Sequence, residues 1–394
     1  KYFEGMKMMN DMMNMDGSMD DMGMGMSLQQ MDMNTVMYPE ITGNSKMKMD
    51  NKMNSNKDLV TLNYGMLKAP LPTTLPKDAP VRELRFELTG NMNRYVWSMD
   101  NKVLSESDKI LIKKGENIRI TLYNGSMMRH PMHLHGHDFR VLNGQGEFAP
   151  LKNVLDIMPM ETDTIEFLAN AEGDWFFHCH ILYHMMAGMN RVFSYEKQAK
   201  NPYLPNKKWA YKKLQSESNK FHFMIENDFT TNGNDGMVML QNTRWSFGTE
   251  WSLGYHDGHG YETETHIGRY IGKNQWFMPF VGFDWRYRKQ NGEVEKNIFR
   301  QTNTKDQRAV LSLGANYTLP MLVKLQGEVF TDGNVRFQLM REDIPVSPRL
   351  RWAFMVNTDK EYMTGFKYIV SRNTGITMHY DSDMGIGFGA SLSY

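Results

Sequence analysis

The sequence predicts an all-β protein in which a Greek-key β-sandwich is followed by an antiparallel, up-and-down β-barrel. From Val81 to about Ser194, short runs rich in β-branched and aromatic residues, such as RELRFELTG and GDWFFHCHI, are closed by turn residues. Short strands at regular spacing are typical of a sandwich. After Asn219 the strands lengthen, and one apolar residue alternates with one polar or small residue, as in Leu311 to Leu319. This second pattern is typical of a barrel wall.

The first 57 residues have a different composition. Sixteen of the 37 methionines lie in this segment, interspersed with Asp, Asn, Gly and Lys and with almost no branched apolar residues. Such a segment cannot bury enough apolar surface to offset its ordering entropy, so we expect it to be disordered. We therefore divide the chain into a Met-rich segment (1–57), a linker (58–80), the sandwich (81–195), a basic linker (196–218) and the barrel (219–394).

Composition excludes several classes of protein. The chain has 45 basic and 45 acidic residues, so a zero formal charge argues against nucleic-acid binding and against membrane attachment by net charge. Cys179 is the only cysteine, which rules out an intrachain disulfide. The chain begins at Lys1 without a signal-peptide pattern, and we expect it to be the back part of a longer protein.

Two histidine clusters carry the chemistry: HPMHLHG, starting at His130, and HCHILYHMMAGM, starting at His178. Successive side chains of an extended strand point to opposite faces. Cys179 therefore faces away from both His178 and His180, and His130 has the opposite parity to the two other histidines of its cluster. This parity divides the residues into two sites. The first collects His130, Cys179, His184 and Met189, and the second collects His133, His135, His178 and His180.

The two donor sets indicate different metal chemistry. Two imidazoles, a thiolate and a weak thioether are what a blue-copper electron-transfer site needs. Four imidazoles suit copper ions that bind dioxygen, and the peptide links of Cys179 to its neighbours offer electrons a short path between the sites. His137 lies outside the pattern and is interpreted as a surface residue or as a support for a ligand.

The two motifs resemble the C-terminal copper motifs of multicopper oxidases, and YNGSMMRHPMHLHG with the Met-rich segment is most similar to the periplasmic copper-resistance protein A type. The resemblance covers residues 81–195 and the Met-rich segment. It implies a cupredoxin-like sandwich and copper cofactors of types 1, 2 and 3. It also implies that Cys179, His178 and His180 carry the catalytic electron transfer. The implied ligands are His130, Cys179, His184 and Met189 for type 1, His133 for type 2, and His135, His178 and His180 for type 3.

The chain departs from this family in one respect. Members of the family complete the trinuclear cluster with two further His-x-His motifs from an N-terminal cupredoxin domain. This sequence contains no other His-x-His. We therefore expect the chain to hold half of a trinuclear site and to need N-terminal cupredoxin domains as partners.

The C-terminal part resembles outer-membrane β-barrels. About ten to twelve candidate strands carry many aromatic residues, and the alternating last strand ends on Tyr394 in GIGFGASLSY. In this context it also resembles the copper-resistance protein B family, which implies a location in the periplasm and outer membrane of a Gram-negative bacterium. A soluble antiparallel β-domain is the alternative.

These features lead to two hypotheses of function. In the first, the chain is part of a copper-resistance oxidase that oxidises Cu(I), or a phenolic surrogate, and reduces O2 to water. In the second, it is a non-catalytic module that binds copper and anchors it at the outer membrane. A laccase acting on organic substrates is disfavoured, because thioethers prefer Cu(I) and the Met-rich segment therefore suggests a metal as the substrate.

Overall fold

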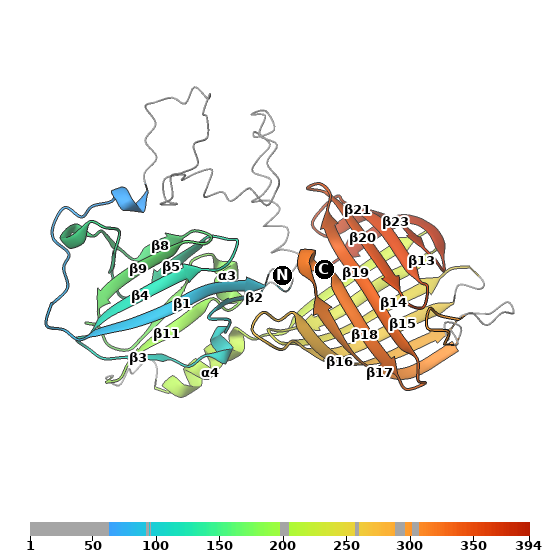
Figure 1. Ribbon diagram of the computed structural model, residues 1–394, viewed down its shortest axis with the longest axis horizontal. Helices are drawn as coiled ribbons and strands as arrows, with labels where there is room; N and C mark the ends of the chain where they lie inside the picture. Colours follow the sequence, from blue (N-terminus) through green and yellow to red (C-terminus); the bar gives the residue numbers. More distant parts are fainter. Residues whose placement is uncertain are drawn as a thin grey trace, which may run out of the picture. The chain divides into compact units, whose positions relative to one another are not determined.

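The computed structural model describes residues 63–91, 94, 96–197, 205–256, 260–287, 296–301 and 307–394 (Figure 1). The disorder expected for residues 1–57 lies outside these residues. The chain divides into two compact units between Asn219 and Lys220. The all-β prediction is confirmed, since the first unit is a two-sheet sandwich and the second is a closed antiparallel barrel.

The sandwich consists of a six-stranded sheet in the order β2-β1-β4-β9-β6-β7 and a five-stranded sheet in the order β3-β11-β10-β5-β8. Most neighbours are antiparallel, but β1 pairs with β4, and β11 with β3, in parallel. The strands are β1 (Val81–Asn91), β2 (Val96–Met99), β3 (Ile110–Ile112), β4 (Asn117–Asn124), β5 (His130–Leu134), β6 (Phe139–Val141), β7 (Leu151–Lys152), β8 (Val154–Ile157), β9 (Thr162–Leu168), β10 (Asp174–Cys179) and β11 (Asn190–Tyr195).

The alternating apolar residues of both sheets meet in one core. Ile118, Ile120 and Leu122 of β4 are fully buried, and so are Phe177 of β10 and Phe193 of β11. Burial of such side chains contributes about 1.5–3 kcal/mol each relative to exposure. This core fixes β5 and β10 side by side, and these are the strands that carry the histidine motifs.

Short helices complete the sandwich unit: η2 (Tyr64–Met66), η3 (Leu104–Glu106), η4 (Gly146–Phe148), α3 (Leu182–Met186) and α4 (Lys207–Glu217). Part of the segment interpreted as a basic linker thus forms a helix. The Asn206 side chain caps it by accepting the N–H of Trp209 at 2.9 Å. None of the helices in the described part of the chain is long and apolar enough to cross a membrane.

The second unit is a ring of antiparallel strands that closes when β12 pairs with β23. Each strand pairs with its neighbours in sequence, so the barrel is up-and-down as predicted. The strands are β12 (His222–Thr230), β13 (Gly233–Gln241), β14 (Trp245–Gly254), β15 (Tyr261–Arg269), β16 (Phe277–Tyr287), β17 (Gln307–Thr318), β18 (Lys324–Phe330), β19 (Val335–Pro345), β20 (Leu350–Asn357), β21 (Tyr362–Ile369), β22 (Thr374–Asp381) and β23 (Gly385–Ser393). A short 3-10 turn, η5 (Pro320–Leu322), joins β17 to β18.

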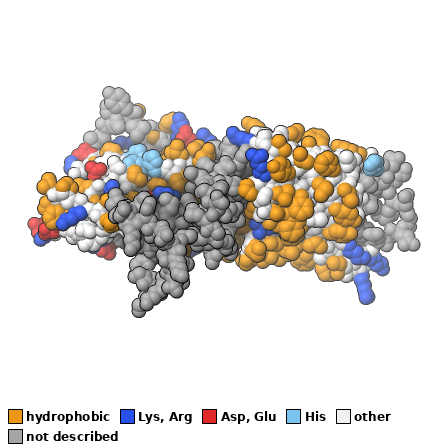
Figure 2. Space-filling view, turned by 90° about the horizontal axis from the view of Figure 1, so that it is seen from above, with side chains coloured by type: hydrophobic (Ala, Val, Ile, Leu, Met, Phe, Trp, Pro, Cys, Tyr) orange, Lys and Arg blue, Asp and Glu red, His pale blue; other side chains and the backbone are white. Residues whose placement is uncertain are grey.

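The barrel has the opposite polarity to the sandwich. In β16 the side chains of Phe283, Trp285 and Tyr287 are exposed, whereas those of Asp284 and Arg286 are buried. The same alternation places exposed apolar residues along the other strands, and Figure 2 shows hydrophobic side chains covering much of the visible barrel wall. Most of the buried residues in the described part of the barrel are polar or charged, with Met278, Phe280, Phe330 and Met340 as the apolar exceptions.

Three acidic residues, Asp156, Glu161 and Asp163, lie where β8 is followed by β9 in the chain. The Tyr64 hydroxyl accepts the N–H of Asp156 at 3.1 Å, and Asp163 of β9 has one carboxylate oxygen buried without a hydrogen bond among the described residues. Burial, followed by the charges of Glu161 and Asp156, raises the pKa of Asp163 to about 7. Ionised Asp163 therefore opposes folding of the sandwich.

We predict that Asp163→Asn stabilises the sandwich at neutral and higher pH. Below about pH 4 the carboxyl is protonated in both the folded and the unfolded state, so the variant and the parent should have similar stability. Between about pH 4 and pH 7 the unfolded state ionises first, and the parent loses stability with rising pH. Above this range the variant should be more stable by roughly 1–3 kcal/mol.

Chemical denaturation at several pH values measures this difference, and Asp138→Asn, at an exposed position, is the matched control. A pH-independent difference between Asp163→Asn and the parent would contradict the assigned pKa.

Candidate metal centre

The pairing of β5 with β10 determines how the two motifs meet. Cys179 lies opposite Met132, and His178 opposite His133. Cys179 and Met132 belong to the buried core, so His178 and His133 point to the other face of this sheet. Two adjacent strands therefore supply side chains to a site inside the sandwich and to a site on its outer face.

The inner site brings together His130, Cys179 and His184, which have no exposed surface. The Cys179 Sγ lies 3.7 Å from Nδ1 of His130 and 3.6 Å from Nδ1 of His184, and the two Nδ1 atoms are 3.1 Å apart. His184 reaches this position because only two residues separate the end of β10 from the start of α3, which turns the chain back. Three donor atoms thus converge on one point.

Neighbouring side chains fix the two imidazoles. The Ser126 Oγ lies 2.6 Å from Nε2 of His130, which leaves Nδ1 of that ring directed at Cys179. Trp97, which is fully buried, stacks on His184 with ring centroids 4.1 Å apart and meets His130 edge-on at 5.2 Å. Neither Ser126 nor Trp97 was anticipated from the sequence, although Ser126 lies only four residues before His130.

Burial sets the protonation of this site. It lowers the pKa of His184 to about 3, and, together with the His184 charge, it lowers the pKa of His130 well below its ordinary value. Burial also raises the pKa of the Cys179 thiol to about 12. The imidazoles are therefore already in the neutral, metal-binding form, whereas a metal must displace the proton of the thiol.

Met189 belongs to the same buried region. Its carbonyl accepts the N–H of Cys179 at 3.1 Å, and its own N–H donates to the His184 carbonyl at 3.0 Å. The preceding Gly188 has a φ of +122°, and a Cβ there would lie 2.4 Å from a Val103 methyl carbon. Glycine is therefore required at position 188 for the chain to bring Met189 beside Cys179 and His184.

The outer site gathers four imidazoles. Nε2 of His135 lies 3.0 Å from Nε2 of His178, and the donor atoms of these two residues and His133 lie within 4.8 Å of one another. The His180 ring is 5.6 Å from that of His133 and 5.9 Å from that of His178. His135 and His180 are exposed, and Figure 2 shows histidine on the visible surface of the sandwich unit. This site is therefore accessible from the surface of the sandwich unit.

Backbone carbonyls orient the outer histidines. Nδ1 of His133 donates to the Asn153 carbonyl at 2.6 Å, and Nδ1 of His178 donates to the Cys179 carbonyl at 2.9 Å. Burial, countered by that hydrogen bond, lowers the pKa of His178 to about 4. With Nδ1 engaged, both rings keep Nε2 as the atom that can bind a metal.

His137 is buried rather than a surface residue. Its Nδ1 donates to the carbonyl of His135 at 3.0 Å, and its Nε2 lies 2.7 Å from the Tyr195 hydroxyl. It therefore holds the backbone of His135 and is not directed at either cluster. Of the two interpretations made from the sequence, the supporting position is the one the structure has.

The barrel contains a third group of potential ligands, Glu264, His266 and Glu328. Arg336 lies between the two carboxylates, 2.6 Å from Glu264 and 3.1 Å from Glu328. Because this guanidinium already supplies positive charge to both, we assign no metal to this group.

The residues of the sandwich fit copper. A buried set of two imidazoles and a thiolate provides the soft donors that copper prefers, and the imidazole-only set on the outer face suits a second, dioxygen-binding kind of copper site. Residues 78–199 match the model of the multicopper oxidase family. This part of the chain is therefore similar to multicopper oxidases, and that family implies the copper cofactors of types 1, 2 and 3 predicted from the sequence.

Curated relatives match over stretches of similar length. Copper resistance protein A of Escherichia coli is 39% identical over 118 residues, which cover 30% of this chain and 20% of the relative. Copper resistance protein A of Pseudomonas syringae pv. tomato is 34% identical over 142 residues, covering 36% and 23%. The chain therefore spans about a fifth of the length of these relatives.

Solved structures give similar coverage. McoA multicopper oxidase from Aquifex aeolicus is 24% identical, with a TM-score of 0.27 and 32% of this chain and 31% of that chain covered. A multicopper oxidase from Campylobacter jejuni, described as a metallo-oxidase, is 23% identical, with a TM-score of 0.26 and 31% of each chain covered.

We predict that Cys179→Ser abolishes the intense visible absorption of the copper-loaded chain, because a hydroxyl cannot replace the thiolate as a soft copper ligand. His135→Ala should keep this absorption, since His135 belongs to the outer cluster. Visible absorption and electron paramagnetic resonance of the two copper-loaded variants provide the measurement. A blue Cys179→Ser variant would contradict the assignment of the inner site.

Proposed function

We propose that the sandwich is the C-terminal copper domain of a copper-resistance oxidase that oxidises Cu(I), or a phenolic surrogate, and reduces O2 to water. The observation that carries this proposal is the pair of sites on the two faces of β10, joined through Cys179. Four substrate electrons and four protons convert one O2 into two waters. Bound copper would supply the one-electron redox chemistry at the inner site and dioxygen binding at the outer one.

The residues of the inner site have distinct roles in this proposal. His130, Cys179, His184 and Met189 would hold the type 1 copper, with the Met189 thioether as the weakest of the four donors. Trp97 and the surrounding core exclude water from it. Low polarity and a fixed donor set reduce the rearrangement that accompanies gain and loss of one electron. The inner site therefore serves electron transfer and not the binding of O2.

Electrons leave the inner site through Cys179. Its backbone is joined directly to His178 and His180, so a few covalent bonds lead from the thiolate to the outer imidazoles. In this proposal His133 would bind the type 2 copper, and His135, His178 and His180 would bind the type 3 pair. The exposure of His135 and His180 is consistent with a further domain that supplies the remaining ligands, which the N-terminal part of a longer protein would provide.

Oxygen uptake with Cu(I) as the sole reductant tests the oxidase proposal. The copper-loaded full chain alone should be blue but should consume O2 very slowly, and addition of the missing N-terminal domains should raise the rate by orders of magnitude. Cys179→Ser with the same domains should stay inactive. A blue, complete assembly that consumes no O2 would exclude the oxidase and favour the alternative, a non-catalytic copper-binding and anchoring module.

We also propose that the barrel spans the outer membrane, with the sandwich in the periplasm, as the resemblance to the copper-resistance protein B family implies. The support is the inverted polarity of the wall, in which Val281, Leu313 and Phe388 are more than half exposed while Ser312 and Arg308 face inward. An apolar outer surface of this extent is costly in water but favourable in hydrocarbon. Strands of 7–12 residues suit a tilted crossing.

The barrel interior favours an anchor over an open pore. Arg286 of β16 contacts Glu361, which directly precedes β21, at 3.0 Å, although these strands lie five places apart in the ring. Arg286 also contacts Glu264 at 2.5 Å, and Arg336 of β19 contacts the same carboxylate at 2.6 Å. These ion pairs join opposite parts of the wall across the interior.

Leu313→Arg should destabilise the barrel in lipid vesicles by about 2–4 kcal/mol if the position lies near the bilayer midplane, because the charge would enter hydrocarbon. Leu151→Arg, at an exposed position of the sandwich, is the matched control and should have no such effect. Urea titration of the full chain in vesicles, followed by the gel mobility of the folded barrel, measures both. A full chain that stays monomeric in water without detergent would contradict the membrane proposal.

A further inference from the structure

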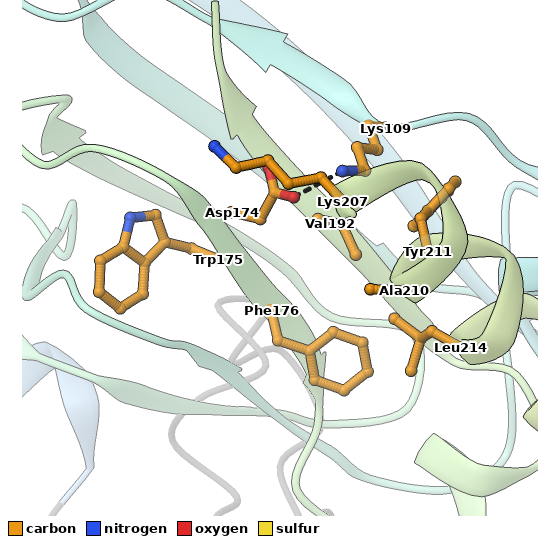
Figure 3. Close-up of a pocket in the computed structure, with 9 residues that line it drawn as sticks. All are labelled: Lys109, Asp174, Trp175, Phe176, Val192, Lys207, Ala210, Tyr211 and Leu214. Carbon is orange, nitrogen blue, oxygen red and sulfur yellow. Dashed lines mark hydrogen bonds and ion pairs between the residues drawn. The ribbon is translucent and has the colours of Figure 1, made fainter. Parts of the chain in front are cut away.

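Helix α4 (Lys207–Glu217) is firmly attached to the sandwich by one face. The Tyr211 hydroxyl donates to the Ser107 carbonyl at 2.8 Å, and the Gln215 side chain donates to the same carbonyl at 3.2 Å. Figure 3 shows Tyr211 and Leu214 directed toward Lys109 and Phe176 of the sandwich, around a shallow cavity of about 250 Å³. This inner face of the helix is therefore occupied.

The opposite face of α4 is basic and carries an exposed tryptophan. Lys208, Trp209, Lys212 and Lys213 are all exposed, and 60% of the Trp209 surface is accessible. The Lys213 ammonium lies 5.4 Å from the centre of the Trp209 ring. The sequence from Lys207 to Ser216 contains no acidic residue, so this outer face is a compact positive patch on a chain with zero formal charge.

The position of this patch in the chain indicates its partner. Helix α4 ends at Glu217 and β12 begins at His222, and five residue steps span at most about 17 Å. Phe221 and Phe223, at the entrance to β12, are exposed apolar residues. If the barrel lies in a membrane, α4 is therefore tethered within reach of the lipid headgroups.

We infer that the outer face of α4 binds the anionic headgroups of the membrane that holds the barrel. This inference rests on the proposed membrane location of the barrel. Lysine ammonium groups attract lipid phosphates, their methylene stems can lie along apolar surface, and tryptophan favours the interface between headgroups and acyl chains. A second copy of this face would be repelled by its like charge. Since the inner face of α4 is fixed to the sandwich, binding holds the copper domain at the headgroup layer.

Quenching of tryptophan fluorescence by brominated lipids tests this inference on the full chain. The chain is reconstituted in phosphatidylcholine vesicles with or without phosphatidylglycerol, with bromine near the headgroup end of the acyl chains. The signal of Trp209 is the difference between the parent and Trp209→Phe. We expect this difference to be quenched in the anionic vesicles, several-fold less in the neutral ones, and progressively less at high salt.

Charge variants separate a specific patch from a general effect of charge. Lys208→Gln/Lys212→Gln/Lys213→Gln should lose most of the Trp209 quenching in anionic vesicles. Lys77→Gln/Lys113→Gln/Lys114→Gln removes the same charge from exposed positions elsewhere on the sandwich and should retain it. Equal quenching in the two triple variants would overturn the inference.

The barrel tryptophans distinguish the two ways in which the experiment can fail. Trp245 and Trp285 are exposed on the barrel and should be quenched in both lipids if the barrel is inserted. Quenching of these residues without any Trp209 signal would overturn the docking of α4 and leave the membrane location intact. Absence of quenching at all tryptophans would overturn the membrane location itself.

Discussion

The two-residue period of strand β10 is the constraint on which the metal centre depends. Because consecutive side chains of a strand point to opposite faces, Cys179 enters the core only if His178 and His180 point out of it. The core selects this arrangement, since Phe177 and Cys179 are both fully buried. A shift of one residue in the pairing with β5 would place the histidines in the core and Phe177 outside, so the hydrophobic packing that stabilises the sandwich also determines which residues can bind metal.

Burial of a metal-binding cluster removes polar groups from water, which is unfavourable in free energy, and the surrounding residues reduce this destabilisation. Two imidazoles and a thiol inside an apolar core must stay uncharged in the absence of metal, and the shifted pKa values of His184 and Cys179 express this. Ser126 engages the remaining nitrogen of His130, and Trp97 fills the space against both rings. The inner site is thus held in shape by packing, whereas the outer site, with two exposed histidines, is held by backbone carbonyls and stays open.

The sequence predicted the fold class and the grouping of the histidines because both follow from local periodicity. Contacts between residues that lie far apart in the sequence could not be predicted from such local patterns. Arg286 and Glu361 are 75 residues apart, and only closure of the barrel brings them together. His137 was ambiguous because its role depends on Tyr195, 58 residues away. Residues 207–217 were interpreted as linker because of their lysines and the prolines before them, while their apolar positions, Ala210, Tyr211 and Leu214, follow helical spacing and pack on the sandwich.

The same alternation of residues produces opposite results in the two units because their charged residues have different partners. In the sandwich the strands pair apolar faces with each other, and most charged side chains lie on the surface, with the buried Arg140–Glu166 ion pair as an exception. In the barrel, Arg286 pairs with Glu361 and Arg336 with Asp284 across the interior, so the apolar residues are left for the outer wall. A buried charge is tolerated only when it is paired, and a closed ring of strands provides partners from several directions at once. Removal of Arg286 would take one counter-charge from each of four interior carboxylates, those of Glu262, Glu264, Asp284 and Glu361, so the polar interior and the apolar exterior of the barrel depend on each other.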